Sequence, residues 1–170
     1  MRPLLLLAVL AAAAALGTQA LAAQRRDATP AIAWKTAKLG LILTTKRHLA
    51  LYTWRREAKG TVRCTGACAK AWPPLLTKGT PKAAHGAKTA LLGVAGRADG
   101  TQQVTYNGNR LYLFVQDTAA RQTKGQKLQG FGGPFCTATL AKKPCIWYAV
   151  SPAGTANTAT AASARSAAAR

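Results

Sequence analysis

The 170-residue chain carries 24 Lys and Arg against 4 Asp and Glu, which gives a formal net charge of +20 at pH 7. Four carboxylates leave one possible pair for acid–base chemistry, and the motifs of serine hydrolases, zinc hydrolases and phosphate-binding glycine loops are absent. The charge predicts association with anionic polymers, although cations scattered singly and in pairs also suit a solubilising surface.

The first 22 residues have the features of a secretory signal peptide. A short basic start precedes an apolar run over residues 4–16, and small residues leading to Ala22 fit a cleavage site. The run is too short to span a membrane, and no later segment is long and apolar enough to do so. We therefore expect an exported protein, periplasmic or extracellular, with a net charge of +19 once Arg2 is removed.

The remaining chain divides into three parts. Residues 23–37 are polar without a clear period and are predicted to be a linker or a loosely held first strand. Residues 38–150 hold every Tyr and Phe and are long enough for one domain with a modest core. Residues 151–170 are mostly Ala, Thr, Ser and Arg and are predicted to be a disordered tail.

The patterns within the domain predict mainly β structure. Residues 48–55 alternate as a strand does, and residues 145–150 resemble a closing strand. Residues 102–106 and 110–116 are predicted to be two strands joined by a tight turn, because Asn107-Gly108 accepts positive φ. No long helical period appears.

One short helix is predicted over Cys64 to Trp72, where the apolar spacing suits two turns and Pro73-Pro74 ends it. The fold class is therefore a single, small, mainly β domain with one short helix.

Four cysteines in an exported domain of this size predict disulfides, and four cysteines allow three pairings. The spacings favour the local pairs Cys64–Cys68 and Cys136–Cys145, because helical residues four apart have Cα atoms about 6 Å from each other, within disulfide range. The second pair brackets a short loop and would staple it.

The phrase LYTWRRE at residues 51–57 recurs as LYLFVQD at residues 111–117. In a strand, Tyr and the aromatic residue two places on share a face, and the acid lies near the strand end. Two such units predict a duplicated β unit with a shared aromatic core and two capping acids, each held by arginines, backbone N–H groups or a turn. The alternative makes the two acids part of a catalytic or cation-binding site. The residues concerned are Tyr52, Trp54, Glu57, Tyr112, Phe114 and Asp117.

These features resemble the secreted repeat proteins of unknown function, often bacterial lipoproteins, described by a Tyr-x-aromatic-x-x-Asp motif. The resemblance runs from about Leu39 to Ala153 and implies tandem repeats in one secreted unit, without an activity. It is carried by both repeated phrases and by Cys64, Cys68, Trp72, Pro73, Pro74, Asn107, Gly108, Gly125, Gln126, the Gly130–Gly133 stretch, Trp147 and Tyr148.

Three departures from the family pattern matter. Glu57 replaces the usual Asp in the first motif, and the usual lipid-bearing Cys is absent, which favours free secretion or a periplasmic location. An insertion, Pro134 to Ile146, carries Cys136 and Cys145 and is consistent with a stapled loop.

Two other kinds of site compete with the structural interpretation. Cys64 and Cys68 could bind copper or serve in thiol redox chemistry, with His48 or His85 completing a copper set. A zinc site is disfavoured by the cysteine spacing, and covalent haem lacks its motif. A hydrolase would depend on the two motif acids, and specific nucleic-acid binding is not expected.

The sequence thus predicts a non-enzymatic exported protein without a cofactor or metal. Its expected partners are anionic cell-envelope polymers or lipid headgroups, bound weakly and in a salt-dependent manner. The copper or thiol redox protein remains the main alternative, and the hydrolase a third.

Overall fold

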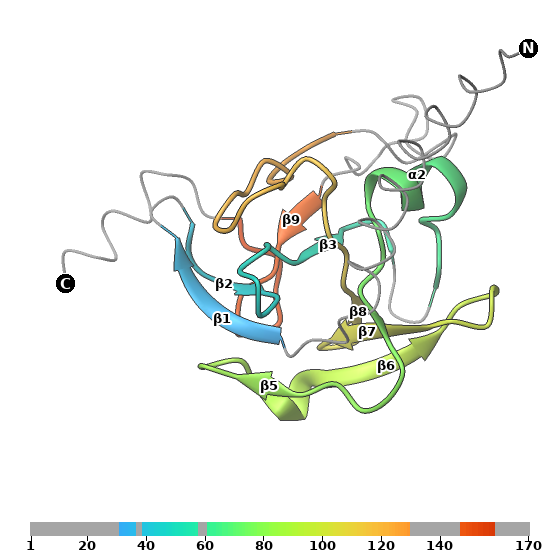
Figure 1. Cartoon of the computed structure of the whole chain (residues 1–170), viewed down its shortest axis with the longest axis horizontal. Helices are drawn as coiled ribbons and strands as arrows, with labels where there is room; N and C mark the ends of the chain where they lie inside the picture. The colour runs from blue at the N-terminus through green and yellow to red at the C-terminus, as the bar shows by residue number, and fades with distance from the viewer. Residues whose placement is uncertain (1–30, 37–38, 58–60, 130–146, 159–170) are drawn as a thin grey trace, which may run out of the picture.

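The computed structural model describes residues 31–36, 39–57, 61–129 and 147–158 (Figure 1). The predicted signal peptide, Cys136, Cys145 and the end of the predicted tail lie outside the described residues. Within the described ranges, no helix combines the length and apolar character that a membrane span requires.

The described chain is mainly β with one short helix, which confirms the predicted fold class. The helix α2 (Gly66–Ala71) and the 3-10 turn η1 (Thr89–Leu91) interrupt the strands. The strands are β1 (Ala31–Thr36), β2 (Gly40–Thr44), β3 (Tyr52–Trp54), β4 (Leu76–Thr77), β5 (Ala83–Ala84), β6 (Leu92–Gly96), β7 (Gln102–Tyr106), β8 (Asn109–Arg110) and β9 (Trp147–Ala149).

The strands form three small sheets. Their orders are β2-β1-β5, β3-β9 and β4-β7-β6, with β8 also paired to β7. The β1–β2, β6–β7 and β7–β8 pairs are antiparallel, and so is β3–β9, which joins segments far apart in the sequence. The β1–β2 hairpin and α2 lie on opposite sides of β3 (Figure 1).

The two repeats exchange their closing segments. The segment after α2 pairs with the second repeat, and the segment from β9 onward pairs with the first. Three backbone hydrogen bonds of 2.7–3.0 Å in one half have counterparts in the other, which relates the halves by an approximate two-fold axis. One set joins Leu43, Leu51 and Val150, and its counterpart joins Val104, Leu111 and Leu75.

Two cores lie on opposite faces of the paired repeats, because successive strand residues point to opposite sides. One core is aromatic and contains Tyr52, Trp54, Tyr112 and Phe114 with both described cysteines. The other is aliphatic and is built mainly of leucine and valine, including Leu51. Both repeated phrases therefore contribute to both cores, as their alternating pattern requires.

The domain is longer than the predicted boundaries at both ends. Ala31–Thr36 is a strand, so the linker predicted over residues 23–37 is wrong for this part, and the second alternative holds there. The predicted tail also begins too early, because Asn157 donates from its side chain to the Leu39 carbonyl at 2.8 Å and from its backbone to Ala149 at 2.7 Å. Small polar residues are ordered here by main-chain pairing, which composition does not reveal.

Other predicted elements are shorter than expected. The strand predicted over residues 48–55 is confined to Tyr52–Trp54, because a turn that ends at His48, with a φ of 59°, precedes it. The predicted turn at Asn107-Gly108 is present, with φ values of 50° and 73°. The strand after it ends at Arg110, and the chain continues as isolated bridges through Tyr112.

Candidate functional site

The two repeated phrases lie side by side at the centre of the molecule. Tyr52 and Tyr112 exchange both of their backbone N–H···O hydrogen bonds, each at 2.9 Å, as an antiparallel bridge. After each aromatic residue the chain makes the same tight turn, since the Glu57 N–H donates to the Trp54 carbonyl at 3.0 Å. Asp117 makes the equivalent bond at 3.1 Å, so both acids lie in corresponding corners.

Each motif tyrosine binds the acid of the other repeat. The Tyr52 hydroxyl donates to Asp117 Oδ2 at 2.6 Å, and the Tyr112 hydroxyl lies 2.8 Å from both oxygens of Glu57. Backbone donors complete each carboxylate: Lys124 N–H binds Asp117 at 2.9 Å, and Arg63 N–H binds Glu57 at 2.8 Å. The motif is therefore a reciprocal clasp between repeats, and the longer Glu side chain serves as well as Asp.

Burial changes the acidity of Asp117 and of both motif tyrosines. Burial, opposed by hydrogen bonds from Tyr52 and Lys124, raises the pKa of Asp117 above its usual value. Burial and the neighbouring carboxylate raise the pKa of both Tyr52 and Tyr112 far above the ordinary tyrosine value. Both hydroxyls thus stay protonated at all physiological pH values and remain hydrogen-bond donors.

Four stacked rings fill the space between the clasps. Trp72 and Trp147 stack with centroids 4.0 Å apart, Trp54 stacks on Trp147 at 5.4 Å, and Phe114 stacks on Trp72 at 4.3 Å. All four side chains are at most 4% exposed. Such stacks add stability beyond their area burial.

The two tyrosines meet this stack edge-on. Tyr52 packs against Trp72 at 5.4 Å and Tyr112 against Trp147 at 5.2 Å, with interplanar angles of 77° and 83°. The pairing follows the same two-fold relationship, since each tyrosine contacts the tryptophan that comes after its own repeated phrase in the sequence. Trp72 and Trp147 are thus equivalent residues of the two repeats.

The predicted Cys64–Cys68 disulfide is present and buried beside the aromatic core. Its Cα atoms are 5.1 Å apart, at the entrance to α2, and Cys64 N–H also donates to Glu57 Oε1 at 3.3 Å. With the bond closed, neither thiolate that the copper alternative needs is present. Among the described residues, no group of three or more His, Cys, Asp or Glu side chains is placed to hold a metal ion.

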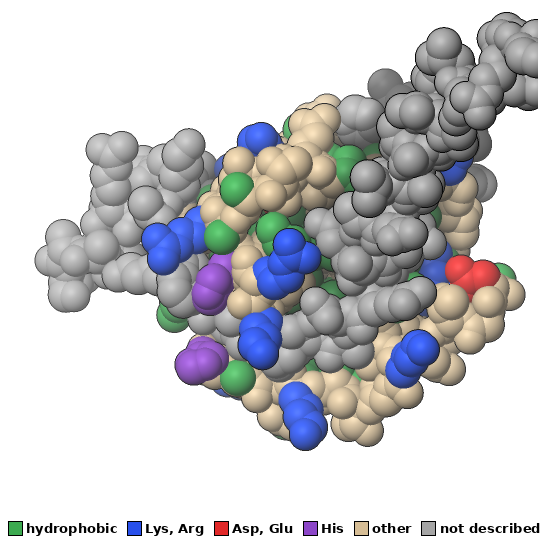
Figure 2. All heavy atoms as spheres, in the orientation of Figure 1, with side chains coloured by type: hydrophobic (Ala, Val, Ile, Leu, Met, Phe, Trp, Pro, Cys, Tyr) green, Lys and Arg blue, Asp and Glu red, His purple; other side chains and the backbone are tan. Residues whose placement is uncertain are grey.

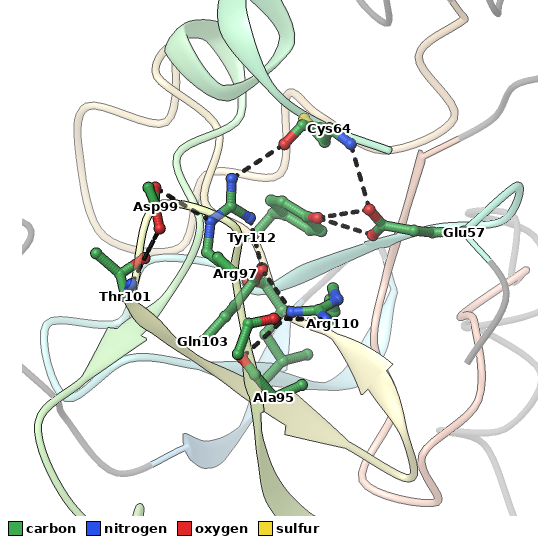
Figure 3. Close-up of polar contacts among 11 residues, drawn as sticks. Glu57, Cys64, Ala95, Arg97, Asp99, Thr101, Gln103, Arg110 and Tyr112 are labelled. Atoms are coloured by element: carbon green, nitrogen blue, oxygen red, sulfur yellow. Dashed lines mark hydrogen bonds and ion pairs between the residues drawn. The ribbon is translucent and has the colours of Figure 1, made fainter. Parts of the chain in front are cut away.

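A second polar network adjoins the Glu57 clasp (Figure 3). Arg97 Nη1 donates to Gln103 Oε1 at 2.8 Å, and the same oxygen lies 3.4 Å from Arg110 Nη1. Arg110 also donates to the carbonyls of Ala95, Gly96 and Thr61, and so ties the edge of β6 to the loop after Glu57. These guanidinium groups bind carbonyl oxygens instead of the motif acids.

Backbone N–H groups hold both motif acids, as expected, whereas the guanidinium groups of Arg97 and Arg110 do not. The unexpected donors are the tyrosine hydroxyls, which lie within the core where the acids point. The one ion pair among the described residues joins Arg97 to Asp99 at 3.7 Å, between β6 and β7. The cross-repeat tyrosine contact was missed because residues sixty places apart give no local signal of contact.

The other predicted site residues take structural positions. Pro73 and Pro74 follow α2, where the Pro73 carbonyl accepts from Leu113 N–H at 2.8 Å and Pro74 bridges to Tyr112. Neither histidine joins the motif acids: His48 lies in the turn before β3, and exposed His85 follows β5 with a φ of 49°.

Comparison with known protein families gives the same division into two repeats. A family model described as a secreted repeat of unknown function matches residues 33–76 and again residues 93–133. The chain belongs to this family. The two matches correspond to the two repeats, and the description supports export without naming an activity. No curated protein and no solved structure gives a significant match.

Proposed function

We propose that this secreted-repeat protein is a non-catalytic binding module that attaches to anionic polymers or lipid headgroups of the cell envelope, in the periplasm or outside the cell. The observation that supports this proposal is the placement of the acids. Glu57 is 7% exposed and Asp117 is 3% exposed, so both charges point inward. Of the described carboxylates, Asp99 alone is exposed, with 60% of its side chain accessible.

Burial of the acids leaves an outer surface dominated by cations. Figure 2 shows Lys and Arg side chains spread singly over the visible face, with one acidic group at its edge. The low density of acids on this surface favours anionic partners over its whole extent. The exposed described cations are Lys46, Arg47, Arg55, Arg63, Lys70, Lys78, Lys82, Lys88, Arg121, Lys124 and Lys127.

Three of these cations lie close together. Lys46 and Arg47 occupy the turn before β3, and Arg121 donates its backbone N–H to the His48 carbonyl at 2.9 Å. The two loops therefore adjoin, and we define Lys46, Arg47 and Arg121 as the basic corner. It is the place where we expect an anionic surface to make its main contact.

A non-catalytic role is supported by the burial and the hydrogen bonds of the motif acids. Each carboxylate is occupied by a tyrosine hydroxyl and a backbone donor, and each is buried, so neither faces a substrate. An open hollow of about 360 Å³ lies beside β6 and is lined by residues such as Thr77, Lys78 and Val94, with no motif acid in its wall. The motif acids are therefore not placed for acid–base hydrolysis.

The test is co-sedimentation of the mature chain with vesicles of phosphatidylglycerol and phosphatidylcholine, compared with phosphatidylcholine alone. We expect binding to the anionic vesicles only, falling steeply as salt is raised, because surface charges are screened over about 10 Å at 0.1 M salt. Salt-independent binding, or no binding to anionic vesicles at low salt, would contradict the proposal.

A matched pair of variants locates the contact. Replacing the three residues of the basic corner by Gln should weaken binding by about 3 kcal/mol, since each cation near an anionic bilayer contributes about 1 kcal/mol. The control replaces Lys70 on α2 and Lys78 and Lys82 between β4 and β5, which carry the same charge but lie outside the basic corner. Equal losses would show that the whole surface binds and would refute the basic corner as the main contact.

A further inference from the structure

The aromatic core contains stacked rings of the kind that can pass single electrons to one another. Trp54, Trp147 and Trp72 stack in a continuous column, and a motif tyrosine packs edge-on against each of the last two. Rings in contact exchange electrons far faster than rings separated by aliphatic side chains. The column is therefore a place where an oxidised ring can be reduced by its neighbour.

The proton chemistry of the rings differs in a way that gives such transfer a direction. The three indole N–H groups are buried, and within the described part of the chain none has a hydrogen-bond partner. An indole that loses an electron becomes a radical cation, which is an acid without a base to receive its proton. A buried charge without a partner is strongly disfavoured.

The motif tyrosines are in the opposite situation. Oxidation of a phenol releases its hydroxyl proton, and here a carboxylate oxygen lies 2.6 Å from Tyr52 and 2.8 Å from Tyr112. Burial also raises the pKa of Asp117, which makes its carboxylate a better proton acceptor. Tyrosine is thus the ring that can be oxidised without leaving an unpaired charge.

We propose that the core is a radical relay: an oxidised Trp72 or Trp147 takes an electron from Tyr52 or Tyr112, and the hydroxyl proton passes to Asp117 or Glu57. The step forms a neutral indole, a neutral tyrosyl radical and a neutral carboxylic acid from an indole radical cation, a phenol and a carboxylate. Charge, electrons and protons balance.

The initiating oxidant belongs to the class of one-electron oxidants, such as peroxide-derived radicals that an exported protein meets. A small one-electron and proton donor, such as ascorbate, restores the phenol, with the carboxylic acid returning its proton to solvent. This role concerns the core and is independent of binding by the surface cations.

Laser photoionisation of the indoles in the full mature chain tests the relay, with dissolved oxygen scavenging the ejected electron. A Trp34→Phe background leaves only the three stacked indoles. We expect the indole radical absorption to decay as the phenoxyl absorption rises, at a first-order rate that does not depend on protein concentration. The rate should fall in D₂O, because the proton moves with the electron.

Two variants test how much the carboxylates contribute to the rate of this transfer. Asp117→Asn combined with Glu57→Gln should slow the transfer about a hundredfold, the usual contribution of a positioned proton acceptor. Tyr106→Phe is the matched control, since that hydroxyl donates to the Pro152 carbonyl at 2.9 Å and no carboxylate accepts from it. Its rate should equal that of the parent.

A purely structural role for the clasp predicts no isotope effect and equal rates with and without the acids, and either result would overturn the relay. If the acid variants fail to fold, the isotope effect in the parent chain still decides the question, because it requires no change at the clasp.

Discussion

Replacing Tyr52 by Phe removes one hydroxyl from the centre of the clasp and leaves the ring. That hydroxyl donates to Asp117 at 2.6 Å and accepts the Gly125 N–H at 3.3 Å. A hydrogen bond to a charged group contributes about 1.5–3 kcal/mol, and Asp117 keeps only the Lys124 N–H at 2.9 Å. We therefore expect the free energy of unfolding to fall by about 2 kcal/mol and the Tm by about 8 °C.

Urea denaturation followed by tryptophan fluorescence measures this loss, since three of the four tryptophans lie in the stack beside Tyr52. Tyr148→Phe is the matched control. Tyr148 is 6% exposed, and its hydroxyl makes no hydrogen bond within the described ranges. The control should change the free energy of unfolding by less than about 0.5 kcal/mol.

A double-mutant cycle separates the hydrogen bond from other effects of the substitution. Combining Tyr52→Phe with Asp117→Asn should cost less than the sum of the single changes, with a coupling energy of about 1–3 kcal/mol. Coupling near zero, or a Tyr52→Phe loss equal to that of Tyr148→Phe, would refute the view that the clasp holds the repeats together.

Three further predictions concern the same core. Burial raises the pKa of both motif tyrosines above 10.0, so at alkaline pH the folded state keeps two protons that the unfolded chain releases. Their contribution to the free energy of unfolding is complete below pH 10. Above pH 10 the free energy of unfolding should fall by about 1.4 kcal/mol per pH unit for each tyrosine, as measured by alkaline denaturation. Cys64→Ala with Cys68→Ala should lower the free energy of unfolding in urea by about 2 kcal/mol, the value that the chain-entropy model gives for so short a loop. Gly125→Ala should cost about 1–3 kcal/mol in thermal melts, because a Cβ there would lie 2.8 Å from Trp72; Gly96→Ala, with no atom within 4 Å of the added Cβ, should cost clearly less.

Local pattern was enough to predict most of the fold class. Alternation and the Asn107-Gly108 turn indicated β structure, and the Pro73-Pro74 pair marked the end of the helix, because each depends on neighbouring residues only. The ends of the domain were misplaced because β1 is held by pairing with β2 and β5, and the turn over residues 151–157 is tied to the domain by side-chain hydrogen bonds such as that from Asn157 to the Leu39 carbonyl. These contacts join segments whose pairing the local pattern does not reveal.

The candidate site was predictable in its residues but not in its connections. The repeated phrase identified the tyrosines, the aromatic partners and the acids, because their spacing places them on one strand face and at one strand end. It could not show that Tyr52 binds Asp117 while Tyr112 binds Glu57. That exchange depends on how the two repeats pack, and within each phrase the same spacing would also allow a tyrosine to face its own acid.

The two halves of the molecule have kept the clasp while diverging around it. The hydrogen bonds that make Leu43 and Val104 equivalent also make the residues before them, Ile42 and Gln103, equivalent positions of the two halves. Ile42 is apolar and Gln103 is polar. Gln103 accepts from the arginines beside the Glu57 clasp, whereas the equivalent Ile42 belongs to the buried aromatic core. Glu57 also accepts two backbone N–H groups, from Arg63 at 2.8 Å and Cys64 at 3.3 Å, whereas Asp117 accepts the Lys124 N–H at 2.9 Å, so the Asp117 clasp depends more on its tyrosine. Loss of the tyrosine hydroxyl should therefore cost more in Tyr52→Phe than in Tyr112→Phe, and the reverse order would show that the second backbone donor does not compensate at the Glu57 clasp.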